Sequence, residues 1–158
     1  MNNLNEALLT ALKMEKKGYE EYIKAADRCE DDTLAAILLS LANDEEEHER
    51  VIGSFYHAMV ESKGWPVVDT SLLPIPEAAE RIELIMNETA AKITDGTTFI
   101  GIYEVAHDLE TRSREFYLNE MGKATDREVI EMFRFLARIE GIHMDMLNLL
   151  LQATRGEA

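Results

Sequence analysis

Apolar residues recur every three or four positions along two long stretches of the chain, residues 3–62 and 98–154. This spacing places the apolar side chains on one face of a helix and leaves the charged residues on the other. All three prolines lie between the two stretches, and proline interrupts a helical pattern because it lacks a backbone donor. The pattern therefore predicts two helical segments joined by a crossover over residues 63–97.

Turn signals divide each stretch into a hairpin of two helices. The capping residues at 30–33 predict that one helix ends near Cys29 and that the next begins near Thr33. Gly122 and the Thr-Asp pair at 125–126 give the same signal in the second stretch. Pro76 precedes a further helical pattern, which predicts an extra helix within the crossover. The expected fold is all-α, an antiparallel four-helix bundle made of two helical hairpins.

The length and composition fit one helical domain. A chain of 158 residues can bury one hydrophobic core but is short for two. Eight glycines and three prolines are too few for a loop-rich β-sandwich. We therefore expect a single domain over residues 1–158.

The net charge bears on the partners. Sixteen Lys and Arg residues against thirty-one Asp and Glu residues give a formal charge of −15. A surface this negative repels phosphate backbones and anionic lipid headgroups, so we expect no nucleic-acid partner and no membrane partner.

The N-terminus and the single cysteine bear on location. Residues 1–10 lack the basic segment and the long apolar run of a secretory signal. Cys29 is the only cysteine, so the chain has neither an internal disulfide nor a Cys-x-x-Cys pair for zinc or a rubredoxin-type iron. We expect a soluble cytoplasmic protein.

The two hairpins repeat each other at an offset of 95 residues, and the residues that match are ionisable or aromatic as well as apolar. The core-facing stripe of each helix is apolar or aromatic apart from a small set of ionisable residues that obey this offset. These residues are Glu15, Glu45, His48, Glu110, Glu140 and His143.

Four carboxylates and two imidazoles on core-facing stripes predict a metal site. Burying an unpaired charge is costly, and two divalent cations would balance four carboxylates. One Glu from each of two helices with Glu-x-x-His from each of two others is the ligand pattern of di-iron and di-manganese bundles. The donor set suits iron or manganese better than magnesium, and zinc stays an alternative. The competing interpretation places these residues at solvated edges of the bundle.

Several other ionisable and aromatic residues lie near this pattern. Glu104 and His107 are also three apart, but their counterparts at the same offset are leucines, so we expect no ligand pair there. His107 lies one turn before a predicted ligand and is a candidate supporting group. His57 lies off its stripe and is expected at the surface. Tyr22 and Tyr117 lie two turns after Glu residues, where each is either a hydrogen-bond donor to a ligand carboxylate across the bundle or a core aromatic.

The motifs ALKMEKKGYEEY, LANDEEEHE, AHDLETRSREFY and LARIEGIH together resemble the ferritin-like superfamily, specifically its rubrerythrin-like branch. The resemblance implies that the six residues are iron ligands and catalytic residues, with Glu45 and Glu140 bridging, and that the ferrous pair reacts with hydrogen peroxide or dioxygen. Ser113 departs from the family pattern, where rubrerythrins carry an additional Glu. These 158 residues also lack the four cysteines of a rubredoxin-like iron site, so we expect no such domain.

Three functions follow as hypotheses. The first is a non-haem di-iron oxidoreductase, a peroxidase or ferroxidase that receives electrons from a separate donor. The second is iron storage, buffering or delivery without turnover. The third is a metal-free or zinc-bearing interaction module. Trp65 and the apolar face of the crossover helix must pack on the bundle or on a second subunit, which makes a homodimer a further prediction. That face consists of Ile82, Ile85, Met86 and Ile93.

Overall fold

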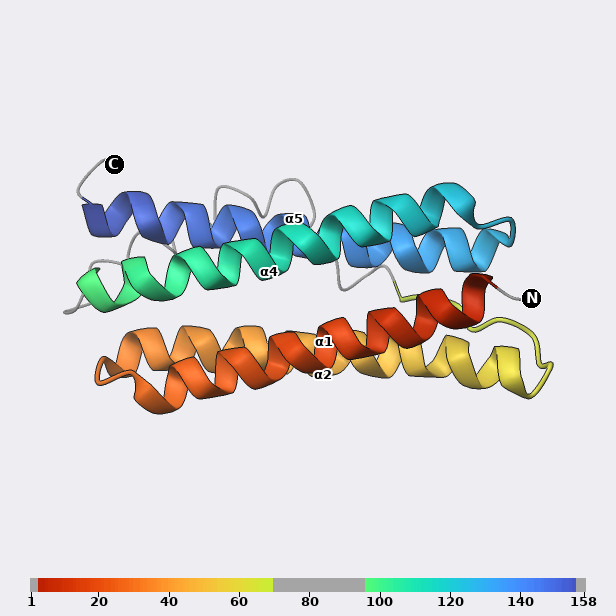
Figure 1. Ribbon diagram of the computed structural model, residues 1–158, viewed down its shortest axis with the longest axis horizontal. Helices are drawn as coiled ribbons and strands as arrows, with labels where there is room; N and C mark the ends of the chain where they lie inside the picture. The colour runs from red at the N-terminus through yellow and green to blue at the C-terminus, as the bar shows by residue number, and fades with distance from the viewer. Residues whose placement is uncertain (1–2, 70–95, 156–158) are drawn as a thin grey trace.

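Four long helices form where the sequence shows helical periodicity. The computed structural model describes residues 3–69 and 96–155, and all its regular secondary structure in these ranges is helical. The helices are α1 (Asn3–Arg28), α2 (Asp32–Val60), α4 (Gly96–Lys123) and α5 (Arg127–Arg155), as Figure 1 shows. The all-α prediction is confirmed.

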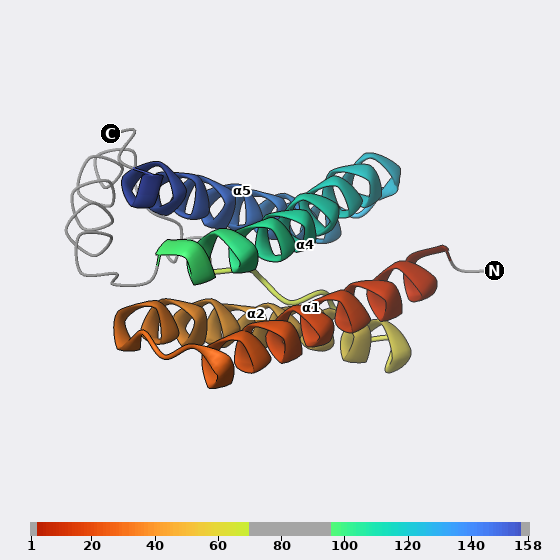
Figure 2. The same ribbon diagram turned by 60° about the vertical axis from the view of Figure 1, so that its left-hand side comes forward.

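The helices pair as two antiparallel hairpins, α1 with α2 and α4 with α5. The hairpins lie against each other, with α1 beside α4 and α2 beside α5. Figures 1 and 2 show that α2 ends at one end of the bundle and that α4 begins at the other, so these two helices run parallel. This arrangement confirms the predicted four-helix bundle with a long crossover.

Local capping explains the first hairpin turn. Asp31 has an extended backbone conformation and its side chain accepts a hydrogen bond from the backbone N–H of Leu34, 3.0 Å away. This is the ordinary N-cap interaction, in which a carboxylate satisfies a backbone donor left free in the first turn. It fixes the start of α2 within one residue of the sequence prediction.

The core consists of two apolar clusters, and the six predicted metal-ligating residues lie between them. One cluster includes Leu8, Phe55 and Phe133, and the other includes Leu38 and Leu147. On each helix the predicted metal-ligating residues fall between a residue of one cluster and a residue of the other. The bundle therefore encloses a polar layer between two dry ends.

The start of the crossover packs on its own bundle. Trp65 stacks on Phe55 of α2, with ring centroids 5.8 Å apart. Trp65 therefore packs on its own bundle, one of the two surfaces that the sequence left open. The predicted crossover helix and its apolar face lie outside the described residues. Within residues 3–69 and 96–155, none of the helices has the length and hydropathy needed to span a membrane.

Candidate metal centre

The six ionisable residues singled out by the repeat are all buried in the middle of the bundle. None has more than 3% of its surface exposed. Glu15 comes from α1 and Glu110 from α4, while α2 and α5 each contribute a Glu and a His three residues apart. Because residues three apart share a helix face, each Glu-x-x-His pair turns both side chains inward.

The six residues form two overlapping groups, in each of which one possible ligand atom per residue lies within 4.8 Å of all the others. The first group contains Glu15, Glu45, His48 and Glu140. The second group contains Glu45, Glu110, Glu140 and His143. Glu45 and Glu140 belong to both groups. A carboxylate has two oxygens, so each of these two residues could contribute an oxygen to both groups.

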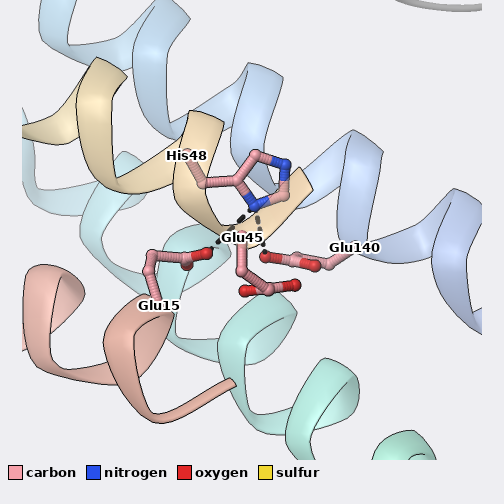
Figure 3. Close-up of side chains that lie close together, drawn as sticks. All are labelled: Glu15, Glu45, His48 and Glu140. Atoms are coloured by element: carbon pink, nitrogen blue, oxygen red, sulfur yellow. Dashed lines mark hydrogen bonds and ion pairs between the residues drawn. The ribbon is translucent and has the colours of Figure 1, made fainter. Parts of the chain in front are cut away.

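Both histidines direct Nδ1 at carboxylates. The Nδ1 atom of His48 lies 3.0 Å from Glu15 Oε2 and 3.5 Å from Glu140 Oε1 (Figure 3). The Nδ1 atom of His143 lies 3.4 Å from Glu110 Oε1 and 3.4 Å from Glu140 Oε2. Each imidazole therefore completes a cluster of oxygen atoms with one nitrogen.

Several atoms of the cluster are buried without a hydrogen-bond partner in the part of the chain that the structure describes. They are Glu45 Oε1, both carboxylate oxygens of Glu140 and His143 Nδ1. Leaving a buried polar atom unpaired costs about 1–3 kcal/mol. Lone pairs that converge from carboxylates and imidazoles are the donors that divalent iron, manganese and zinc accept. The residues therefore fit a pair of metal ions.

Two tyrosines hold the outer carboxylates. The hydroxyl of Tyr22 on α1 donates a hydrogen bond to Glu110 on α4, and the hydroxyl of Tyr117 on α4 donates to Glu15 on α1. Both rings are buried. The two contacts are related by the repeat, and each fixes a carboxylate from the facing helix. Hydrogen bonds of this kind orient metal ligands and tune their affinity.

Burial controls the pKa values of the outer carboxyls. Burial and the charge of Glu140 raise the pKa of Glu15 and of Glu45 well above the ordinary range. Burial and the same charge raise the pKa of Glu110 to about 8. These shifts favour the protonated form of all three carboxyls when no cation is bound.

The pKa values of Glu140 and of the two histidines shift in the directions that favour their charged forms. Burial alone would raise the pKa of Glu140, but the nearby Glu110 carboxyl and the imidazoles of His143 and His48 lower it. Burial alone would lower the pKa of His143, but its hydrogen bond with Asp44 and the nearby Glu110 carboxyl raise it well above the ordinary value. The pKa of His48 is raised against its burial by Glu140. Protons therefore balance the site where cations otherwise would.

Asp44 is a site residue that the sequence interpretation missed. Its Oδ2 lies 3.1 Å from Nε2 of His143, the ring nitrogen that faces away from the carboxylates. The Asp44 side chain is half exposed and lies off the core-facing stripe, which is why the stripe did not reveal it. The available signal was its place directly before Glu45 in the chain.

Gly18 was also missed. It lies three residues after Glu15 on the core-facing side of α1 and is buried. A Cβ atom at this position would stand 2.9 Å from Oε2 of Glu45, which is closer than real Cβ contacts. The absence of a side chain here therefore leaves the room that the Glu45 carboxylate occupies.

A cavity of about 150 Å³ between α1 and α4 reaches the second group. Its wall includes Glu45 and Glu110, together with Gly18 and its repeat counterpart Ser113. Both small residues lie where a longer side chain would fill the space. A larger cavity of about 250 Å³ lies further along α1 and α4, and none of the six clustered residues lines it.

The remaining predictions concern residues outside the cluster. Glu104 and His57 are exposed, as expected. His107 is half-buried, and its side chain contacts Thr111 and the ring of Tyr103. It belongs to neither of the two groups.

The fold and the buried cluster together define the class of protein, a ferritin-like helical bundle with a candidate carboxylate–histidine metal centre. The family model for rubrerythrin matches residues 6–151. The chain therefore belongs to the rubrerythrin family. Neither a search of curated proteins nor a search of solved structures returned a match.

Proposed function

We propose that this protein binds two iron ions at the six clustered residues and uses them to reduce hydrogen peroxide or dioxygen. The observation that carries the proposal is the pair of overlapping groups that share Glu45 and Glu140. A pair of ions bridged by two carboxylates is the arrangement of di-iron helical bundles. The family match supports the same assignment.

Each residue has a defined part in this proposal. Glu15 and His48 would hold one ion, Glu110 and His143 the other, and the two shared carboxylates would bind both. When bound as Fe(II), the pair supplies two electrons, which with two protons reduce one hydrogen peroxide to two waters. Manganese binds the same donors, whereas zinc supplies no electrons.

The cavity between α1 and α4 supports a small oxidant as the reactant. It leads to Glu45 and Glu110 and is wide enough for molecules of a few atoms. Lys17 and Arg112, which are repeat counterparts, lie on its wall and are exposed. Their positive charges do not repel neutral peroxide or dioxygen, but they disfavour a metal cation on this path. We therefore propose that the oxidant, rather than iron, uses this route.

The test begins with anaerobic Fe(II) titration of the metal-free protein. We expect about two ions per chain, the number that this ligand pattern implies. Hydrogen peroxide added with an external reductant should then be consumed over many cycles, and a Glu140→Gln variant should lose this activity. A chain that binds no iron at the cluster would refute the proposal.

Iron storage or buffering is the second candidate, favoured by the formal charge of −15, which attracts cations to the protein. The two functions differ in kinetics. An enzyme consumes peroxide repeatedly when a donor returns the electrons, whereas a storage protein oxidises its bound iron once and stops. Counting peroxide consumed per chain with excess reductant distinguishes them.

A further inference from the structure

The repeat that relates the two halves of the cluster is broken at a residue that touches it. Asp44 directly precedes Glu45 on α2, and its repeat counterpart, Ile139, directly precedes Glu140 on α5. Asp44 reaches the outer nitrogen of His143 at 3.1 Å. Ile139 has no polar atom to offer His48, and it packs against an apolar cluster instead. Within the described residues, the second group therefore has a carboxylate behind its histidine, whereas the corresponding position of the first group is an isoleucine.

The contact with Asp44 determines which His143 nitrogen faces the cluster with a lone pair. A carboxylate accepts a hydrogen bond, so Nε2 of His143 carries the hydrogen and donates it to Asp44. In the neutral ring that binds metal, Nδ1 then presents its lone pair toward Glu110 and Glu140. This Nδ1 is buried and makes no hydrogen bond within the described residues. Asp44 thus fixes which His143 nitrogen faces the cluster.

His48 is held differently. Its Nδ1 already lies at hydrogen-bond distance, 3.0 Å, from Glu15 Oε2. A cation in the first group must displace that contact before His48 can bind through the same atom. The contact that orients His48 is therefore lost on metal binding, whereas the contact that orients His143 is kept.

We infer that the two metal positions are inequivalent, because Asp44 positions His143 so that the second group binds its ion before the first group and more tightly. Asp44 is a positioning residue, since it acts through His143. The inference rests on the metal binding proposed above but not on the redox activity. It predicts the order in which metal-free protein is loaded.

The test uses Co²⁺, whose binding is followed by calorimetry and whose visible absorption bands report its ligands. Glu15→Gln removes a ligand from the first group alone, and Glu110→Gln removes one from the second group alone. In the Glu15→Gln chain, Asp44→Ala should weaken Co²⁺ binding by about 10–100-fold, the usual effect of losing the partner of a metal-ligating histidine. The visible absorption bands of the bound Co²⁺ should shift as well. In the Glu110→Gln chain, Asp44→Ala should change the affinity less than about twofold.

Two controls separate positioning from charge and folding. Glu46→Ala removes the same charge from the exposed face of α2, so it measures the general electrostatic effect. Asp44→Asn keeps a hydrogen-bond acceptor and should recover part of the affinity and the original absorption bands. Unchanged melting temperatures of the metal-free variants would show that the bundle is intact.

The outcomes are distinct. If Asp44→Ala weakens both groups equally, or acts mainly in the Glu110→Gln chain, the inequivalence is refuted while the metal site stands. Equal affinities for two ions in the unmodified protein would have the same meaning. If the unmodified protein binds no Co²⁺, the proposed metal site fails, and the inference fails with it.

Discussion

The two halves of the cluster share their ligands but differ in what surrounds them. In both halves the outer Glu and the His come from the same hairpin. A tyrosine of the other hairpin donates a hydrogen bond to that Glu. The halves differ behind the histidine, where Asp44 stands against Ile139, and in access, because the cavity reaches Glu110 but not Glu15. Repetition specifies which residues can bind metal, and the departures from it decide how each half is used.

The largest expected effect follows from removing a shared residue. Glu140→Gln should weaken the binding of both ions by more than about 100-fold, because a ligand common to both groups is lost. Losing a direct ligand costs more affinity than losing the hydrogen-bond partner of a ligand. Glu110→Gln should weaken only one ion. Metal content after gel filtration, measured by elemental analysis, distinguishes about two, one and no ions per chain.

The contrast between these variants tests the sharing itself. Glu110→Gln is the matched control, since it makes the same chemical change at a buried carboxylate and keeps an acceptor for Tyr22. If Glu140→Gln protein retained one tightly held ion, Glu140 would belong to a single position and the overlapping geometry would not describe the bound state.

The proton load of the metal-free site predicts an unusual dependence of stability on pH. The pKa values of Glu15, Glu45 and Glu110 are raised in the folded chain, to about 8 for Glu110. Between the ordinary Glu range and pH 8, the folded chain therefore holds protons that the unfolded chain has lost. The free energy of unfolding should fall as pH rises through this window, by about 1.4 kcal/mol per pH unit for each such proton.

Urea unfolding of metal-free protein between pH 6 and pH 9 measures this slope. The raised pKa values of the two histidines add to it in the same direction, while the lowered pKa of Glu140 acts only below this window. Glu110→Gln should reduce the slope of unfolding free energy against pH by up to the contribution of one proton, about 1.4 kcal/mol per pH unit. A stability that rose with pH in metal-free protein would show that the carboxyls are ionised when the site is empty of cations.

Much of this arrangement follows from the sequence because it depends on local or repeated signals. Helix ends were predicted within a few residues since capping residues such as Asp31 act on the adjacent turn. The six clustered residues were predicted because each falls on a core-facing stripe and recurs at the same offset. Asp44 gave no such signal, since it is half exposed and its counterpart is Ile139. Gly18 gave none because its contribution is an absent side chain. The crossover helix stays a prediction.

A smaller effect is expected from filling the space beside Glu45. A Cβ at Gly18 would approach Oε2 of Glu45 to 2.9 Å, and the carboxylate must move to admit it. Because Glu45 belongs to both groups, Gly18→Ala should weaken the binding of both ions by roughly tenfold. Gly53→Ala on α2 is the control, since a Cβ there meets nothing within 4 Å.

The same pair of variants separates metal binding from folding. Replacing a mid-helix glycine by alanine usually stabilises a helix by about 0.5–1 kcal/mol. Gly53→Ala should show this gain in thermal unfolding and leave Co²⁺ affinity unchanged. Gly18→Ala should lose most of the gain to the contact with Glu45. Equal affinities in the two variants would mean that Glu45 reaches the ions from a different conformation.

The smallest effect is expected from making the two halves alike. Ile139→Asp places a carboxylate at the repeat counterpart of Asp44, from which it can accept a hydrogen bond from Nε2 of His48. Measured in the Glu110→Gln chain, where only the first group remains intact, Co²⁺ affinity should rise by up to about tenfold. Ile139 packs against an apolar cluster, so unfolding should become easier by about 1–2 kcal/mol. Ile139→Ala supplies the control, because it loses the same packing without adding an acceptor and should bind no more tightly. An affinity that fell equally in both variants would mean that position 139 influences the site through packing. A carboxylate directly before the ligand Glu would then not be sufficient to position the histidine.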